Sequence, residues 1–187
     1  MKISTELTPL KDLIIVQNEI FQDDRGFFLE SYRQDKFEEL GLPKAFVQDN
    51  HSGSVRNVLR GLHFQWDPPM GKLMRVTAGT AFLVAVDIRK GSDTYGQWHG
   101  MEVSKGDGKQ VWAPAGFARG FCALSEFVEV QYKCTGIYNP DAESGIRWND
   151  PAIGIEWPID DPILSDKDKR AQTLQEWEEK PESDYFL

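Results

Sequence analysis

Short strand-like runs, separated by turns rich in glycine and proline, constrain this chain more than any other feature of its sequence. The run Leu13–Val16 is rich in β-branched residues, Thr80–Ile88 is almost continuously apolar, and Phe127–Cys134 alternates apolar with polar residues. Each of these patterns is typical of a β-strand. Turn signals lie between such runs, at residues 67–71, 91–96 and 114–116. The whole pattern predicts an all-β sandwich or barrel with short peripheral helices.

Two stretches favour helices instead. Asp35–Gly41 fits a short helix that its glycine closes. Ser165–Glu179 is charged and carries Leu174 and Trp177 at helical spacing, which predicts one helix laid over the sheet. We therefore expect a C-terminal helical tail over residues 165–187.

The composition suits a single domain over residues 1–187, because the chain is long enough to bury a core and has 40% apolar and 12% aromatic residues. A formal net charge of −9 disfavours nucleic acid and anionic membranes as partners. Cys122 and Cys134 lie in apolar strand-like sequence and are expected to be buried, reduced thiols. No segment is apolar over the length of a bilayer, and the N-terminus lacks a signal pattern. These features predict a cytoplasmic protein.

A cation and an imidazole lie three residues apart in the strand-like run Val58–Phe64. Simple alternation places Arg60 on one face of the strand and His63 on the other. Gly61 lies between them, where a β-bulge would re-aim one of the two side chains. His63 can be a core histidine bonded to a carbonyl or a functional imidazole. The chain has only three histidines, and polar residues surround this one, which favours the functional interpretation.

Metal and nucleophilic chemistry find little support in the sequence. Gln65, not a second histidine, follows His63 at ligand spacing, and the two cysteines are too far apart to indicate a zinc site. There is no Gly-x-Ser-x-Gly motif and no glycine-rich phosphate loop before a helix. General acid–base chemistry by His63 and a second titratable group remains. Tyr132 is the candidate partner, although a packed core tyrosine is the alternative for a residue that shares a face with apolar neighbours.

Many short motifs occur in a fixed order along the chain. They are Asp24–Glu30, Gln48–Ser52, Asn57–Gln65, Gly71–Lys72, Val86–Arg89, Ser92–Gly96, Pro114–Ala118, Tyr132–Cys134, Tyr138–Pro140, Glu143–Pro151 and Leu164–Asp168. In these motifs the chain resembles the dTDP-4-dehydrorhamnose 3,5-epimerase family over nearly its whole length. The resemblance implies a cupin-type jelly roll, a homodimer that exchanges N-terminal strands, and no metal or organic cofactor.

The resemblance also implies catalytic roles. The family substrate is a thymidine-diphosphate 4-keto-6-deoxyhexose, whose ketone acidifies the hydrogens on the two flanking carbons. His63 would remove such a proton, with Asp168 orienting its ring. Lys72 and Arg60 would stabilise the enolate oxygen, and Tyr132 would return a proton from the opposite face.

Further positions correspond to substrate contacts of the family. These are Arg25, Glu30, Gln48, Asn50, Arg60, Arg119, Tyr138, Glu143 and Lys167. Tyr138 matches the residue that stacks on thymine, while Arg25 and Lys167 would offset the diphosphate charge. The stretch around Arg25 and Glu30 alone would indicate a surface ion pair of little value. If strands are exchanged, both residues are expected to come from the neighbouring subunit.

One position departs from the family pattern. Where the family commonly reads Gly-Phe-Ala-His-Gly-Phe, this chain has Arg119 in place of the histidine. An arginine stays charged and cannot serve as a base, although it could hold a diphosphate or polarise an oxygen. The leading hypothesis is an isomerase of rhamnose biosynthesis that inverts C3 and C5. A mono-epimerase acting on C3 or C5 only, a non-catalytic nucleotide-sugar-binding cupin and a metal-dependent cupin oxygenase are the alternatives.

Overall fold

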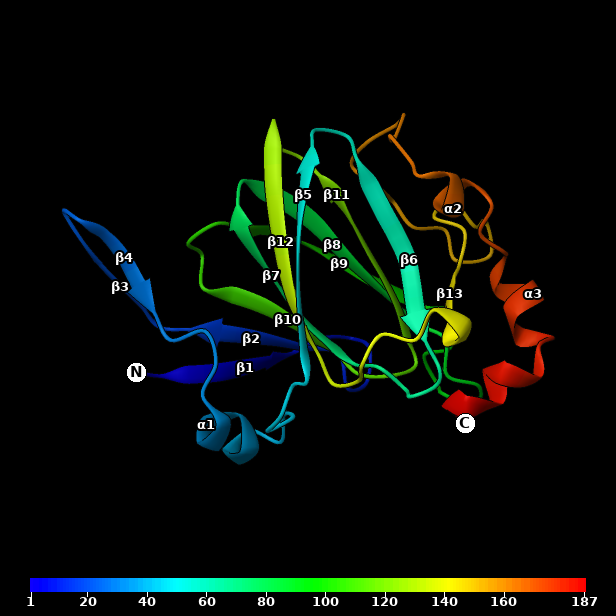
Figure 1. The fold of residues 1–187 in the computed structure, drawn as a ribbon, viewed down its shortest axis with the longest axis horizontal. Coiled ribbons are helices and arrows are strands. Elements are labelled where there is room, and N and C mark those ends of the chain that lie inside the picture. The colour runs from blue at the N-terminus through cyan, green and yellow to red at the C-terminus, as the bar shows by residue number, and fades with distance from the viewer.

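The computed structural model describes all 187 residues, and two antiparallel sheets form its body (Figure 1). The strands are β1 (Ile3–Leu7), β2 (Ile14–Asn18), β3 (Ile20–Asp23), β4 (Gly26–Leu29), β5 (Gln48–Val55), β6 (Leu59–Gln65), β7 (Lys72–Ala78), β8 (Thr80–Asp87), β9 (Trp98–Ser104), β10 (Lys109–Ala113), β11 (Phe117–Ala123), β12 (Phe127–Cys134) and β13 (Glu143–Gly145). One sheet has six strands in the order β1-β2-β10-β7-β12-β5, and the other has five in the order β13-β6-β11-β8-β9. Apart from the β8–β9 hairpin, the chain changes sheet at every step from β5 to β13. This connectivity is that of a jelly roll, so the predicted all-β fold is confirmed.

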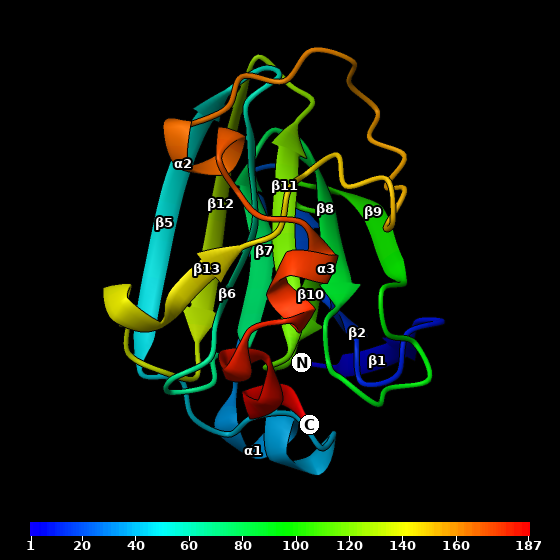
Figure 2. The same ribbon diagram turned by 90° about the vertical axis from the view of Figure 1, so that its right-hand side faces the viewer.

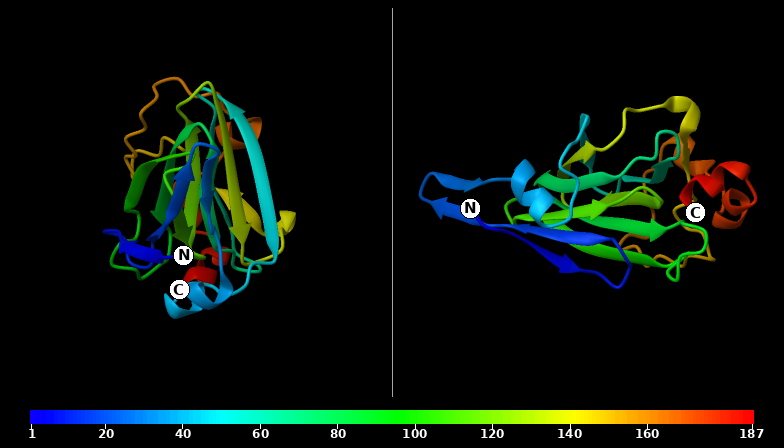
Figure 3. Two further views of the ribbon diagram at one scale, coloured as in Figure 1. Left: turned by 90° about the vertical axis from the view of Figure 1, so that its left-hand side faces the viewer. Right: turned by 90° about the horizontal axis from the view of Figure 1, so that it is seen from below.

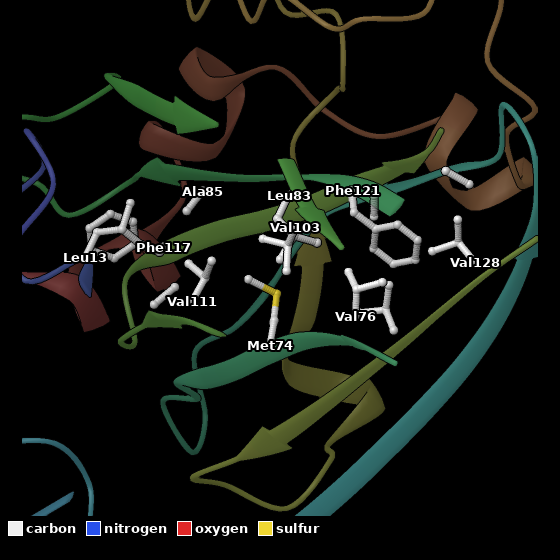
Figure 4. Packing of buried hydrophobic residues seen from close by; sticks show 14 of the residues in the cluster. Leu13, Met74, Val76, Leu83, Ala85, Val103, Val111, Phe117, Phe121 and Val128 are labelled. Carbon is white, nitrogen blue, oxygen red and sulfur yellow. The ribbon is translucent and has the colours of Figure 1, made fainter. Parts of the chain in front are cut away.

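The main core lies between the two sheets, where their inner faces meet (Figure 4). Leu83 and Phe121 come from the five-stranded sheet, and Met74, Val76 and Val128 come from the six-stranded sheet. These positions alternate with residues that face outward, because successive side chains of a strand point to opposite faces. The alternation seen in the sequence of β12 therefore reflects this core.

The C-terminal tail covers the outer face of the five-stranded sheet (Figure 2). Leu62 and Phe64 point outward from β6, and Trp177 packs on Phe64 with ring centroids 4.5 Å apart. The tail consists of α2 (Asp166–Lys169), α3 (Leu174–Glu178) and the 3₁₀ helix η2 (Pro181–Phe186).

The prediction of one continuous helix over Ser165–Glu179 is wrong, since α2 and α3 are separate helices. Thr173 begins α3 with a capping box, in which its hydroxyl accepts from the Glu176 amide and the Glu176 carboxylate accepts from the Thr173 amide. Asp150 also accepts from the Leu174 amide at 2.6 Å. These contacts fix a new helix start that side-chain spacing alone could not reveal.

A hairpin of β3 and β4 projects away from the sandwich, at the end opposite the C-terminal helices (Figure 3, right). Phe21, Phe27 and Phe28 on this hairpin are 48%, 47% and 61% exposed. The hairpin is followed by α1 (Gln34–Glu39), which confirms the helix predicted over Asp35–Gly41.

Three strands of the structure, β1, β11 and β13, lie in segments where the residue patterns predicted none. β11 is the central omission, because all seven of its residues are buried and its pattern therefore lacks alternation. Both cysteines are buried free thiols, as predicted. No helix has the length and apolar character needed to cross a membrane.

Candidate active site

A bulge in β6 brings Arg60 and His63 to the same cavity. Arg119 on β11 pairs with His63, but the register shifts before Arg60, so β6 carries one extra residue in between. Gly61 lies within this irregularity with a φ of +132°, and a Cβ there would lie 2.6 Å from the Cα of Gly120. Only glycine satisfies both conditions. Both side chains now line the cavity, so the predicted bulge is confirmed.

The cavity has a volume of about 460 Å³ and opens between the two sheets. Strands β5, β7 and β12 of one sheet and β6 and β11 of the other supply its walls, and residues 163–165 with α2 close one side. Its polar lining consists of Ser52, Arg60, His63, Lys72, Arg119, Tyr132, Ser165 and Asp168. All four of the predicted catalytic residues are therefore in one cavity.

His63 and Asp168, which lie 105 residues apart in sequence, form the shortest contact in this cavity, with Nε2 of the ring 2.6 Å from Oδ1. Ser165 caps α2 and donates its hydroxyl to Oδ2 of Asp168 at 2.8 Å. Burial raises the pKa of Asp168, but hydrogen bonds from His63 and Ser165 outweigh it and leave that pKa below its ordinary value. A charged carboxylate only accepts, so Nε2 carries a ring proton, and Nδ1 is the ring nitrogen that can accept one.

Tyr132 faces the cavity from β12, in the sheet opposite His63. Lys72 on the neighbouring strand β7 places Nζ 4.8 Å from the centroid of its ring. Burial raises the pKa of Tyr132, so its hydroxyl remains a proton donor at neutral pH. Burial, together with the charge of Arg119, lowers the pKa of Lys72 to about 8. The cavity thus holds an imidazole on one wall and a phenol with a cation on the other.

Arg119 is 3% exposed and lies on the central strand of the five-stranded sheet. Its Nη1 donates to the carbonyl of Met70 at 2.8 Å and to that of Ala113 at 3.4 Å. Nε and Nη2 have no hydrogen-bond partner in the protein. Burial lowers the pKa of Arg119 to about 10, which still leaves it charged at neutral pH.

Five predicted substrate contacts do not line this cavity but form one hydrogen-bonded group between the edge strands β5 and β13. Tyr138 donates its hydroxyl to Glu143 at 3.0 Å, and Lys167 forms an ion pair with the same carboxylate. Gln48 donates to the side chain of Asn50 at 3.0 Å and accepts from the Tyr138 amide at 2.8 Å. The Tyr138 ring is half exposed, which leaves a face open to a ligand.

Arg25 and Glu30 are not brought to this cavity within one chain. Arg25 lies in the turn of the projecting hairpin and pairs with Asp23. Glu30 lies 3.5 Å from Arg33. The surface pair that the local stretch alone would indicate is not formed, because Arg25 and Glu30 each have a partner closer in sequence.

Fold and cavity together define a class: jelly-roll proteins with an acid–base pocket in which an imidazole and a phenol face each other from opposite sheets. The model of a family described as dTDP-4-dehydrorhamnose 3,5-epimerase matches residues 7–176. The chain belongs to the dTDP-4-dehydrorhamnose 3,5-epimerase family, and it is an isomerase of the cupin-type fold. The predicted resemblance is confirmed.

Individual relatives agree with this assignment. A dTDP-4-dehydrorhamnose 3,5-epimerase from Salmonella typhimurium is 53% identical over 172 residues, covering 90% of this chain and 94% of the relative. The crystal structure of dTDP-6-deoxy-D-glucose-3,5-epimerase from Legionella pneumophila, in complex with dTDP-4-keto-L-rhamnose, has a TM-score of 0.90 at 45% identity and covers 93% of this chain and 94% of its own. A dTDP-4-dehydrorhamnose 3-epimerase from Streptomyces niveus is 40% identical over 156 residues, which is 82% of this chain and 75% of that relative.

Proposed function

We propose that this chain inverts C3 and C5 of dTDP-4-dehydro-6-deoxy-D-glucose and so produces dTDP-4-dehydro-L-rhamnose. The observation that carries the proposal is the placement of His63 and Tyr132 on opposite sheets, facing one cavity. Removal of a proton on one face of a carbon and return of a proton on the other inverts that centre. A base alone would only exchange the proton.

The first step is proton abstraction next to the C4 ketone. Nδ1 of His63 takes the proton, the C–H electron pair forms a C=C bond, and the carbonyl π pair moves onto O4 as an enolate. Asp168 accepts a hydrogen bond from Nε2 and stabilises the imidazolium that forms. Lys72 stabilises the negative charge on O4.

The second step returns a proton from the other wall. The hydroxyl of Tyr132 donates its proton to the carbon, the C4 carbonyl re-forms, and the phenolate is reprotonated from solvent while His63 releases its proton. The raised pKa of Tyr132 suits this role, because the group stays protonated until the enolate needs it. The set of groups in the cavity supplies the whole reaction, so we expect no metal or organic cofactor.

The nucleotide is proposed to lie along the edge of β5 and β13. Tyr138 offers a half-exposed ring for stacking on thymine, beside the amides of Gln48 and Asn50. Lys167, which is paired with Glu143, lies where it can offset diphosphate charge. Arg60 is held nearer the far end of β5, by Ser54 Oγ at 3.0 Å and the Gly53 carbonyl at 3.1 Å.

A homodimer is proposed to complete each site. The hairpin β3–β4 projects from its own chain with three phenylalanines exposed, which suits packing on a second copy. In such a dimer Arg25 and Glu30 would reach the cavity of the partner subunit. We also propose that the enzyme acts in the cytoplasm.

The test is proton NMR of dTDP-4-keto-6-deoxyglucose incubated with the protein in deuterated water. Loss of the C3 and C5 signals with an L-lyxo product supports the proposal. Exchange at one carbon only supports a mono-epimerase, which the Arg119 substitution and the 3-epimerase from Streptomyces niveus keep as the second candidate. If neither carbon exchanges its proton, the result contradicts both the double epimerase and the mono-epimerase.

A further inference from the structure

Arg119 is a buried cation, and three of its five N–H donors are unused. Nη1 donates to the backbone carbonyls of Met70 and Ala113, while Nε and Nη2 have no partner in the protein. Buried guanidinium N–H groups without an acceptor are unfavourable, since they have lost water and gained nothing in return. This side chain lines the same cavity as His63 and Tyr132. The protein therefore supplies no acceptor for Nε and Nη2, and the cavity is where a ligand could supply one.

The charge of Arg119 is also uncompensated. Neither Arg119 nor Lys72 forms an ion pair with any carboxylate of the protein. Asp168, the one carboxylate in the cavity lining, is hydrogen-bonded to His63 and Ser165 instead. Other titratable groups face Arg119. They are His63 from β6, Lys72 from β7, and Tyr132 and Cys134 from β12, while β8 presents Ala85. Two cations in one cavity, neither of them paired with a carboxylate, favour the binding of an anion.

Arg60 is placed less well for the same anion. Its guanidinium is bound to Gly53 and Ser54, whereas Tyr132 pairs with Asn50 on the same strand β5. Three to four residues of strand separate these positions by roughly 10–13 Å. Arg60 is held toward one end of the cavity, and Arg119 pairs directly with His63 across β11 and β6.

We propose that Arg119, through Nε and Nη2, donates hydrogen bonds to the oxyanion that forms on O4 of the substrate, so that Lys72 and Arg119 hold the enolate together. The inference rests on the proposed function and assigns to Arg119 a task that the family resemblance gave to Arg60. Proton abstraction places a full negative charge on O4, where the ketone carried only a partial one. The guanidinium of Arg119, charged and donating two hydrogen bonds beside that atom, would therefore bind the enolate more strongly than the ketone.

A second cation changes how the enzyme responds to alkaline pH. Lys72 has a pKa of about 8 and loses its charge above that pH, whereas Arg119 has a pKa of about 10 and keeps its charge. The rate should fall only in part as Lys72 deprotonates. Without the charge of Arg119, Lys72 becomes the only cation on O4 and its pKa rises toward its ordinary value. The rate should then fall completely, at higher pH than in the wild type.

The experiment compares wild type, Arg119→Gln and Arg119→Lys by the rate of deuterium incorporation at C3 and C5, and by the affinity for dTDP in calorimetry. We expect Arg119→Gln to lower kcat roughly 10²-fold, as for other lost oxyanion donors, with the Kd for dTDP within about twofold of wild type. Arg119→Lys keeps the charge but loses the fork, so its loss of kcat should be smaller. Arg147→Gln, an exposed arginine outside the cavity, is the control.

Each outcome decides the proposal. If the wild type is active and the kcat of Arg119→Gln lies within about threefold of it, the oxyanion role is overturned while the proposed function stands. If the affinity of Arg119→Gln for dTDP falls by the same factor as its kcat, the oxyanion role is overturned in favour of a contact with the diphosphate. A wild type that exchanges no proton overturns the proposed function and this role together. If Arg119→Gln unfolds, Arg119→Lys decides: a kcat below that of the wild type with an unchanged Kd for dTDP supports the oxyanion role, and a wild-type kcat overturns it.

Discussion

The backbones of Gly61 and Gly120 approach so closely that a Cβ on Gly61 would lie 2.6 Å from the Cα of Gly120. This contact lies at the point where the pairing of β6 and β11 changes register. Arg60 and His63 flank the contact and both line the cavity. The positions of Arg60 and His63 therefore depend on two glycines that have no side chain of their own.

Gly61→Ala is expected to destabilise the protein by about 3 kcal/mol or more, because it adds backbone strain at a φ of +132° to a clash with another strand. Gly154→Ala is the matched control, since Gly154 also has a positive φ but nothing within 4 Å of a Cβ. That change should cost about 1 kcal/mol. Urea unfolding measures the loss of unfolding free energy in both variants. Equal losses would show that the close approach of Gly61 to Gly120 contributes nothing.

Asp168→Asn should lower the rate of proton exchange at least about 10²-fold, because an amide no longer fixes the Nε2–H tautomer or stabilises the imidazolium. Asp166→Asn, an exposed carboxylate in the same short helix, is the control and should leave the rate unchanged. Deuterium incorporation measured by NMR gives both rates. An Asp168→Asn enzyme with the wild-type rate would remove this carboxylate from the mechanism.

The same carboxylate predicts a pH dependence of stability. Hydrogen bonds hold the pKa of Asp168 below its ordinary value despite burial, which raises it. The carboxylate therefore stabilises the folded state fully above its unfolded pKa of about 3.9, and this contribution is lost as the pH falls through the lower folded pKa. Unfolding free energies of wild type and Asp168→Asn should thus converge below about pH 4. A constant difference from about pH 7 down to about pH 3 would contradict the assignment.

Tyr132→Phe should separate proton exchange from inversion. His63 can still remove the proton, so deuterium should enter the substrate, but the new proton would return on the same face and the configuration would be retained. The change removes one hydroxyl and keeps the ring that Lys72 packs against. Tyr185→Phe, an exposed residue of η2, is the control. Normal inversion by Tyr132→Phe would assign the acid role to another group.

The sequence patterns that succeeded were those of half-buried strands. The run Phe127–Cys134 shows the two-residue period because Val128, Val130 and Tyr132 face the interior while their neighbours face outward. β11 shows no such period, since both of its faces are covered and it contains small residues. Arg119 thus lay in a segment to which no strand was assigned, and its place in the cavity could not be predicted from the pattern.

The candidate site depended on different information. His63 and Asp168 lie 105 residues apart and come from a strand and a short helix of the tail, so no local spacing relates them. The family resemblance supplied that pairing, and the geometry agrees with it. Local patterns did locate the bulge at Gly61, because a glycine inside a strand commonly marks a bulge or a close approach of two backbones.

The proposed exchange of hairpins predicts complementation between two inactive variants. Arg25→Ala removes a contact that would be donated to the partner subunit, and His63→Ala removes the base within the same subunit. In a mixed two-fold dimer, one cavity would have an intact His63 together with an intact Arg25 from the other chain, while the second cavity would lack both.

Random re-pairing of equal amounts of the two variants should therefore restore about a quarter of the wild-type activity, since half of the dimers are mixed and each has one complete site. The mixture is unfolded, refolded together and assayed at substrate concentrations below KM, where loss of Arg25 is most visible. Each variant refolded alone is the control, and light scattering should give twice the chain mass of 21.3 kDa. No recovery from a dimeric mixture would mean that Arg25 does not act across the interface, and a monomeric mass would exclude the exchange itself.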